Sequence, residues 1–137
     1  MNNCLFCKIA KGEIPCYKVY EDNNILAFLD ISQTTKGHTL VITKEHFQNF
    51  LYVPKDLLSQ AISVAQKVAQ AEIASLGAKG VNILINTNEE AGQTIMHFHI
   101  HVIPRYDNND NISIEFTPTA IEKLNLPALA NKIQEKI

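Results

Sequence analysis

The sequence contains very little arginine, and this shortage limits the ligands that the protein can bind. Its 137 residues include 12 lysines and arginines against 14 aspartates and glutamates, and Arg105 is the one arginine. The net charge of −2 argues against the strongly basic surface that nucleic acids and anionic membranes attract. A single guanidinium also excludes phosphate binding by clustered arginine forks, so any bound phosphate has to be held by other groups.

Targeting and membrane-spanning segments are also missing from the sequence. Residues 1–8 have neither the basic region nor the apolar core of a secretory signal. The longest apolar run is far shorter than the ~20 residues of a spanning helix. We therefore expect a cytoplasmic protein that binds neither membranes nor nucleic acid, and the odd number of cysteines, 3, suits that reducing compartment.

No repeat, low-complexity tract or linker divides the chain, so we expect a single domain covering residues 1–137. Apolar and β-branched patterns predict a hairpin at 19–30 and strands at 38–43, 80–86 and 95–103. Three-and-four spacing predicts one long helix from Pro54 to a stop at Gly77, with short helices between 118 and 137. Each parallel pair needs a crossover, so one long helix favours an α+β fold with an antiparallel sheet of about five strands.

The most informative motif is a run of alternating histidines. Side chains alternate along a strand, so His97, His99 and His101 share one face, opposite an apolar face. Neighbouring histidines lie ~6.6 Å apart along such a strand, so the three do not converge easily on one ion. A lone histidine is more often a hydrogen-bonded core residue, but three in alternation indicate function. Imidazoles can supply a neutral nucleophile and a protonated donor at the same pH.

Several segments together resemble the histidine triad (HIT) superfamily, and specifically the small bacterial Hit proteins on its Hint side. The likeness covers nearly the whole chain. Besides the histidine run, it rests on residues 4–9 (CLFCKI), 12–15 (GEIP), 19–22 (VYED), 27–31 (AFLDI), 37–42 (GHTLVI), 91–94 (AGQT) and 104–105 (PR). The resemblance implies the HIT-like α+β fold and a homodimer whose two sheets join.

The resemblance also implies a catalytic role for the middle histidine. His99 would attack the α-phosphorus of a nucleotide and form a covalent nucleotidyl-histidine, which water then hydrolyses. A neutral imidazole is a competent nucleophile, and a two-step displacement divides one difficult step into two. His101 and His38 resemble the partners that bind the phosphate or assist proton transfer to the leaving group. The less favoured alternative is that His38 is a strand residue hydrogen-bonded to a neighbour.

Substrate contacts follow from the same resemblance. The six positions concerned are Asp30, Ile31, Asn86, Gly92, Gln93 and Thr94. The carboxylate of Asp30 would accept both ribose hydroxyls, and Ile31 would touch the base. The loop 92–94 would hold the phosphate through backbone N–H groups and a hydroxyl, with Asn86 on the phosphate side. Without the resemblance, this loop is an ordinary connection rich in turn formers, and apolar residues beside Asp30 are plain core.

A second constellation is the pair Cys4 and Cys7. Alone, this spacing could mark a redox motif or two reduced thiols, because a zinc site needs two further ligands. Resemblance to zinc-carrying members of the family assigns these to His46 and His97. Four protein ligands close the coordination sphere, so one zinc ion per chain would be structural.

Four functions are open at this point. The preferred one is hydrolysis or transfer at the α-phosphate of purine nucleotides, with AMP-amine adducts and other nucleoside phosphoramidates as substrates. Dinucleoside polyphosphates are the second substrate class. A different hypothesis is a zinc hydrolase in which His97 and His99 share a catalytic metal. A fourth is a nucleotide-binding module without catalysis.

Overall fold

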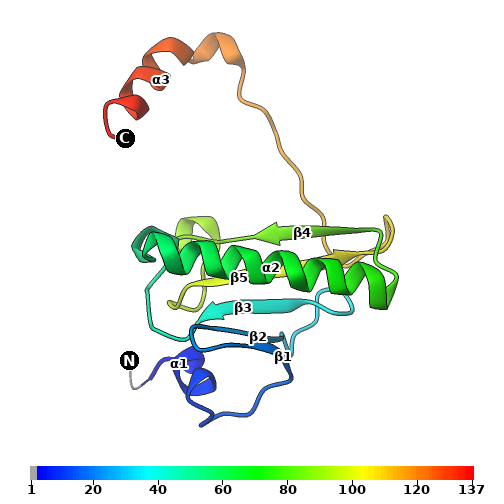
Figure 1. Cartoon of the computed structure of the whole chain (residues 1–137). Helices are drawn as coiled ribbons and strands as arrows, with labels where there is room; N and C mark the ends of the chain where they lie inside the picture. Colours follow the sequence, from blue (N-terminus) through cyan, green and yellow to red (C-terminus); the bar gives the residue numbers. More distant parts are fainter. Residues whose placement is uncertain (1–2) are drawn as a thin grey trace.

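The computed structural model describes residues 3–137, and its centre is one antiparallel sheet (Figure 1). The strands are β1 (Lys18–Glu21), β2 (Ile25–Leu29), β3 (Thr39–Thr43), β4 (Gly80–Leu84) and β5 (His99–Arg105). Their spatial order is β1-β2-β3-β5-β4, which places β1 and β4 at the edges. The α+β class and the antiparallel sheet of five strands are confirmed.

The last predicted strand begins later than expected, and this displaces His97 from the sheet. We predicted a strand over 95–103, whereas β5 covers His99–Arg105. The backbone N–H of Phe98 donates to the carbonyl of Phe47, at 2.7 Å, in the segment that follows β3. The chain before His99 is therefore bonded to a neighbouring loop. Strand β4 ends at Leu84, before the predicted end, and the loop after it contains a 3₁₀ turn, η2 (Glu89–Ala91).

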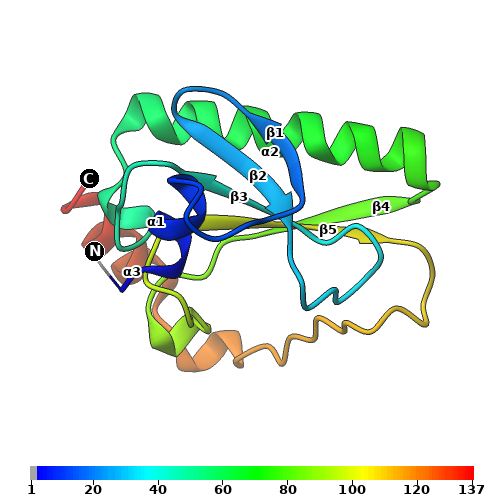
Figure 2. The same ribbon diagram turned by 90° about the horizontal axis from the view of Figure 1, so that it is seen from below.

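The long helix α2 (Lys55–Leu76) has the predicted 22 residues and lies along one face of the sheet (Figures 1 and 2). Gly77 ends it in the left-handed conformation, with φ of 74°, which glycine adopts without strain. The apolar side of the helix packs on the sheet. Buried residues of this core include Ala61, Val64, Ala65 and Val68 from α2, and Val41, Ile100 and Val102 from the strands.

The opposite face of the sheet carries the short N-terminal helix α1 (Leu5–Ala10). A smaller apolar cluster lies here, formed by Phe6, Leu26, Phe28, Leu40 and Ile42. In the β3–β5 register, Leu40 pairs with His101 and Ile42 with His99. Paired side chains lie on one side of a sheet, so both histidines lie on this face. His99 and His101 therefore share one face of β5, as predicted, whereas His97, which we expected on the same strand face, precedes β5.

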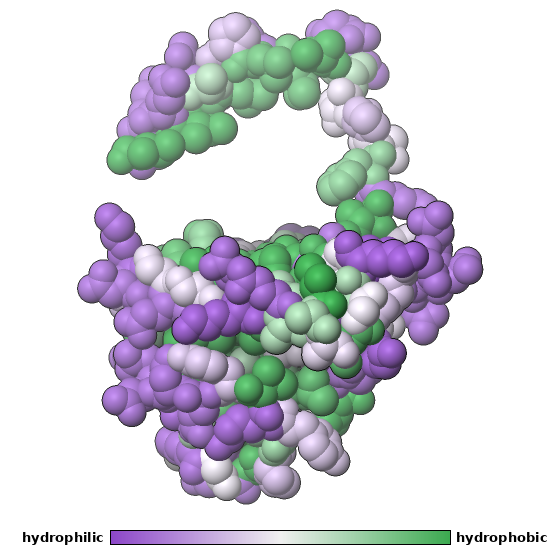
Figure 3. Space-filling view, turned by 45° about the vertical axis from the view of Figure 1, so that its right-hand side comes forward, coloured by the Kyte–Doolittle hydropathy of each residue, from purple (hydrophilic) through white to green (hydrophobic). Residues whose placement is uncertain are grey.

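The C-terminal arm, residues 113–137, stands apart from the sheet (Figure 1). It carries the short turn η3 (Ile121–Lys123) and helix α3 (Leu126–Gln134), in the region where short helices were predicted. Apolar surface runs along the arm in Figure 3, and Phe116 and Ile133 are 87% and 63% exposed. Across residues 3–137, each helix is too short or too polar to cross a bilayer.

Candidate active site

Two strands bring three histidines together. His99 and His101 are on β5, and His38 immediately precedes β3. The Nε2 atom of His38 lies 2.9 Å from Nδ1 of His101, and the ring centroids of His99 and His101 lie 5.0 Å apart. His38 and His99 are buried, and His101 is half-buried. The residues assigned to catalysis from the sequence thus form one cluster.

Hydrogen bonds define which nitrogen of each ring carries a proton. Nδ1 of His99 lies 2.7 Å from the carbonyl of His97, and a carbonyl can only accept, so this nitrogen donates. Nε2 of neutral His99 therefore keeps its lone pair. The backbone N–H of Thr34 donates to Nδ1 of His38 at 3.4 Å, so Nε2 of His38 donates to Nδ1 of His101. Neutral His101 then carries its proton on Nε2.

Burial keeps these rings neutral. It lowers the pKa of His99 and of His38, although Asp30 opposes the change at both. Burial, followed by the neighbouring rings of His99 and His38, lowers the pKa of His101 to about 4. Neutral imidazoles are therefore present at neutral pH, as a histidine nucleophile requires. A protonated donor is not present in the free protein at that pH, which corrects the expectation of both states together.

An apolar cavity opens beside the histidines. Its volume is about 330 Å³, within the usual size for a small-molecule site, and Asp30 and Ile31 lie on its wall. Asp30 is half-buried, and one carboxylate oxygen lies 3.8 Å from Nε2 of His38. Ile31 is 87% exposed, so it is a rim residue and not part of the core.

Helix α1 contributes residues that the sequence analysis did not assign to the site. Phe6 and Ile9 line the cavity, together with Phe28 and Leu40 from the sheet. The ring of Phe6 packs edge to face on His99, with centroids 5.1 Å apart, and so supports the nucleophile. The sequence did contain a signal for Phe6, because this residue lies between Cys4 and Cys7. A metal bound by the two cysteines would fix the position of Phe6.

The loop 92–94 is ordered by its own hydrogen bonds. The backbone N–H groups of Gly92 and Gln93 donate to carbonyls at Glu89 and Asn88. The buried side chain of Gln93 accepts from the N–H of Asn88 and donates to Gln48 and Ile95. These N–H groups are therefore committed within the loop, and Gln93 shapes it.

The other loop positions lie where a ligand can reach them. Thr94 is exposed, and the amide of Asn86 lies against Gly92, where an added Cβ would be 3.8 Å from it. Arg105 is not free for phosphate, because it pairs with Asp110 at 2.9 Å and bonds to Asn82.

The predicted metal ligands also cluster. One ligand atom from each of Cys4, Cys7, His46 and His97 lies within 4.8 Å of all the others. Nδ1 of His97 lies 3.4 Å and 3.5 Å from the two sulfur atoms and 3.1 Å from Nδ1 of His46. Zn–S and Zn–N bonds of about 2.3 and 2.0 Å give tetrahedral separations of roughly 3.5 Å between nitrogen and sulfur and roughly 3.3 Å between two nitrogens, close to these distances, so these atoms fit zinc.

The second nitrogen of His97 supports that assignment. Nε2 donates to the carbonyl of Thr43 at 2.7 Å, which turns the lone pair of Nδ1 toward the cysteines. His99, in contrast, uses Nδ1 to bind the carbonyl of His97 and lies outside this cluster. The two rings therefore do not share a metal position, and the hypothesis of a catalytic zinc between them receives no support from the geometry.

The fold and the site define a class: a small α+β domain that presents neutral histidines beside an apolar cavity. The sequence pattern of the HIT domain matches residues 11–108. The chain belongs to the HIT family. It is 50% identical over 108 residues to Protein hit of Bacillus subtilis (strain 168), covering 79% of this chain and 74% of that protein.

Other relatives have named activities. The adenosine 5'-monophosphoramidase hnt1 of Schizosaccharomyces pombe is 36% identical over 135 residues, covering 98% of each chain. The adenylylsulfatase HINT3 of Arabidopsis thaliana is 38% identical over 108 residues, covering 79% of this chain and 55% of that protein.

Solved structures match the whole fold, including the arm. A HIT family protein from Bacillus anthracis is 46% identical with a TM-score of 0.92, covering 99% of this chain and 98% of the other. A zinc-bound histidine triad family protein from Mycobacterium smegmatis is 39% identical with a TM-score of 0.77, covering 98% of both chains.

Proposed function

We propose that this protein hydrolyses purine nucleotides at the α-phosphate through a covalent nucleotidyl-histidine on His99. The observation that carries the proposal is the 2.7 Å hydrogen bond from Nδ1 of His99 to the carbonyl of His97, because it leaves Nε2 unprotonated and able to attack. The likeness to a monophosphoramidase over 98% of both chains supports the same reaction class.

The first step forms a bond between Nε2 of His99 and phosphorus while the bond from phosphorus to the leaving group breaks. The leaving amine or phosphate departs with the bonding electrons, and an amine takes up the proton that His101 donates. In the second step water attacks phosphorus and gives one proton back to His101, the bond to His99 breaks, and the nucleoside monophosphate leaves with neutral His99 restored. The carbonyl of His97 stabilises the positive charge that the ring carries in the intermediate.

His101 and His38 supply hydrogen-bond donors in this scheme. His38 donates to Nδ1 of His101 and so keeps the proton of His101 on Nε2. Nε2–H of His101 is therefore the free donor of the hydrogen-bonded pair His38 and His101. A bound phosphate brings negative charge to the site, which favours the protonated form of His101 and raises its pKa from about 4. His101 can then donate to the phosphate or to the leaving group.

The remaining residues hold the nucleotide. Asp30 accepts the ribose hydroxyls at the cavity wall, and Ile31 covers the base at the rim. The exposed hydroxyl of Thr94 and the amide of Asn86 contact the phosphate, whereas Gly92 and Gln93 give the loop its shape. This division differs from the expectation that the N–H groups at 92 and 93 bind phosphate.

Nucleoside phosphoramidates such as AMP-amine adducts are the proposed substrates, with dinucleoside polyphosphates second. Intact-protein mass spectrometry after brief mixing with an adenosine phosphoramidate tests the proposal. We expect a mass increase of one AMP that maps to the peptide containing His99. Tight AMP binding without adduct or product would instead support the binding-module alternative, and turnover lost on chelation while the fold persists would support the zinc hydrolase.

The zinc site is proposed to be structural. Cys4, Cys7, His46 and His97 would hold one ion per chain, and bound zinc there would tie α1 and the segment after β3 to the start of β5. These ligands complete a four-coordinate sphere, which leaves no open position for water. The zinc-bound relative from Mycobacterium smegmatis supports zinc as the metal.

The homodimer is proposed from two apolar surfaces. Strand β4 is a sheet edge on which Ile83 and Leu84 are 44% and 38% exposed, and the arm exposes Phe116 at 87%. Exposed apolar surface of this kind marks contacts with another chain. A second copy that joins at β4 would cover the edge and receive the arm.

A further inference from the structure

Glu72 is an acidic residue within the apolar face of α2. Its side chain is 6% exposed and lies in line with the buried residues Ala65 and Val68. One carboxyl oxygen, Oε2, lies 3.2 Å from the hydroxyl of Thr39 at the start of β3. The other, Oε1, is buried and has no hydrogen-bond partner within residues 3–137. An ionised carboxylate here would place an unpaired charge in the core.

The hydrogen count around Thr39 favours a protonated Glu72. The Thr39 hydroxyl lies 2.8 Å from the carbonyl of Gly37 and 3.2 Å from Oε2 of Glu72. A hydroxyl has one hydrogen, and a carbonyl can only accept. Both contacts are hydrogen bonds when Glu72 donates to Thr39 and Thr39 donates to Gly37. Burial acts in the same direction, since it raises the pKa of Glu72 from 4.5 to about 7.

This chain of bonds ends beside a catalytic histidine. Gly37 and Thr39 flank His38, and the turn is tightly packed on α2. A Cβ added to Gly37 would lie 2.6 Å from Leu76 and 3.1 Å from Oε2 of Glu72. A movement of the Gly37 carbonyl is therefore passed to His38, whose ring lies 2.9 Å from His101 on the other face of the sheet.

We propose that Glu72 is a positioning residue for His38. Gain or loss of the Glu72 proton switches the catalytic face between an ordered and a relaxed state. The inference rests on the proposed nucleotidyl transfer, because it assigns His38 to that reaction. Protonated Glu72 donates to Thr39 and keeps Thr39 on Gly37. Ionised Glu72 becomes an acceptor, draws the Thr39 hydroxyl to itself and releases the turn that holds His38.

The groups packed against Glu72 do not compensate its charge. Strands β2, β3 and β4 contain no acidic, basic or histidine residue. Tyr106, which follows β5, lies near Glu72. Burial is the main cause that raises the pKa of Tyr106, and the charge of Glu72 is the second. Lys36 lies over the Tyr106 ring at 5.3 Å, and Arg105 is paired with Asp110. The switch therefore responds chiefly to solution pH.

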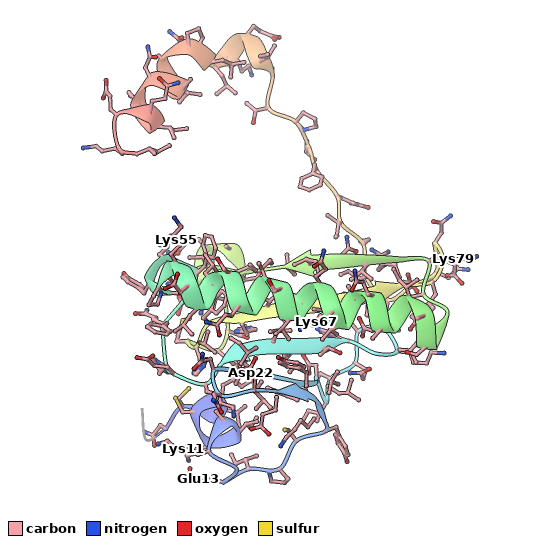
Figure 4. All side chains as sticks on the ribbon, in the orientation of Figure 1. Lys11, Glu13, Asp22, Lys55, Lys67 and Lys79 are labelled. Carbon is pink, nitrogen blue, oxygen red and sulfur yellow. The ribbon has the colours of Figure 1, made fainter. Side chains whose placement is uncertain are left out.

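The charged residues of α2 itself face away from this interface. Figure 4 shows Lys55 at the start of α2, Lys67 near its middle and Lys79 beyond its end, and all three are exposed. Asp56 is also exposed, which makes it a matched control for replacing a carboxyl by an amide on the same helix. His99 and His101 lie on the opposite face of the sheet.

A carbon-13 NMR titration of the full-length protein tests the link without using turnover. We expect the Glu72 carboxyl to titrate near pH 7 and the His38 ring signal to show an inflection at the same pH. Each of the five histidines has a lowered pKa, so their own ionisations fall below this one. Glu72→Gln removes the inflection from His38, and Asp56→Asn keeps it.

A second variant keeps the test decisive should Glu72→Gln not fold. In Thr39→Val the Glu72 carboxyl still titrates, but the His38 inflection is lost. A His38 signal that is indifferent to the ionisation of Glu72 in the native protein overturns the proposal, as does a Glu72 that titrates at an ordinary carboxyl pKa.

Turnover of an adenosine phosphoramidate gives a separate readout. We expect kcat of the native protein to fall about three- to tenfold above pH 7 as the histidine loses its alignment. In Glu72→Gln, kcat should no longer fall above pH 7, whereas Asp56→Asn should show the same fall as the native protein. If kcat of Glu72→Gln falls as much as that of the native protein, another group causes the fall, and the proposal is contradicted. Absence of turnover in every form contradicts the proposed function, and the NMR titration still decides the link.

Discussion

At the scale of single residues, the site is determined by which nitrogen of each histidine carries a proton. The carbonyl of His97 orients His99, the N–H of Thr34 orients His38, and His38 in turn orients His101. These partners are close in the chain for His99 and His38, but His38 and His101 are 63 residues apart. The tautomer of His99, the proposed nucleophile, is thus set by local backbone, and that of His101, the proposed donor, by the pairing of β3 with β5.

The nucleophile predicts an acid limb in the pH profile. Burial lowers the pKa of His99, and the neutral form is the one that attacks. Formation of the AMP adduct should therefore rise as pH increases through this pKa, which lies below 6.5, and reach its maximum before pH 7, above which ionised Glu72 lowers it. Rapid-quench measurement of the adduct across pH checks this. A rate that increases as pH falls below 6.5 would show that another group is the nucleophile.

Glu72 predicts a pH-dependent stability with a definite sign. Its folded pKa of about 7 exceeds the ordinary 4.5, so the folded protein holds a proton that the unfolded chain releases between these values. The contribution of Glu72 to the free energy of unfolding therefore falls as pH rises from 4.5 through 7, by up to about 3 kcal/mol. Urea unfolding of the native protein and of Glu72→Gln at pH 5 and pH 8 isolates this contribution, because the histidines, whose pKa values are lowered, act on both proteins alike. We expect the native protein to lose stability relative to the variant at pH 8. The same change between the two pH values in both proteins would sink the assignment.

At the scale of elements, the proposed zinc site would join helix α1 to two irregular segments of the chain. Helix α1 is six residues long, and the residues around His46 and His97 are irregular. An isolated helix of this length is unstable in water, so α1 depends on its tertiary contacts. Phe6, which packs on His99, is held in place through the neighbouring Cys7.

We therefore expect Cys7→Ser to lose metal and stability together. Plasma mass spectrometry should find about one zinc per chain in the native protein and almost none in the variant. Thermal unfolding should shift to lower temperature, and kcat should fall because Phe6 no longer supports His99. Cys16→Ser is the matched control, since Cys16 lies outside the cluster. Retention of zinc in Cys7→Ser would contradict the ligand set.

Elements with a clear repeat were predictable, and contacts between distant elements were not. Helix α2 matched its spacing and its glycine stop because both are local properties of the chain. The burial of Glu72 was not foreseen, since a glutamate within a helical pattern is ordinarily solvated. The start of β5 was misplaced because the N–H of Phe98 bonds to Phe47, 51 residues away. The resemblance assigned the site residues, but it did not show that Gly92 and Gln93 bond within their own loop.

At the scale of the whole molecule, the arm and the β4 edge leave apolar surface exposed. The family match ends at residue 108, so the arm lies beyond the HIT domain itself. Figure 3 shows its apolar surface facing a gap above the sheet. A second copy of the chain would bury this surface.

Removing the arm should therefore weaken self-association. We expect analytical ultracentrifugation to give a dimer for the full chain and a higher dissociation constant, by about tenfold or more, after truncation at residue 112. Phe116→Ser, a single change at a residue that is 87% exposed, should act in the same direction. A full-length chain that is monomeric at high concentration would refute the homodimer.

The central claim is that His99 bonds transiently to phosphorus, and its replacement by alanine tests this most directly. Turnover of an adenosine phosphoramidate and AMP affinity by calorimetry should be measured on the same His99→Ala protein. The account predicts that kcat falls by at least about three orders of magnitude, while AMP still binds within about tenfold of the native affinity. Undiminished turnover by a folded His99→Ala protein would contradict it.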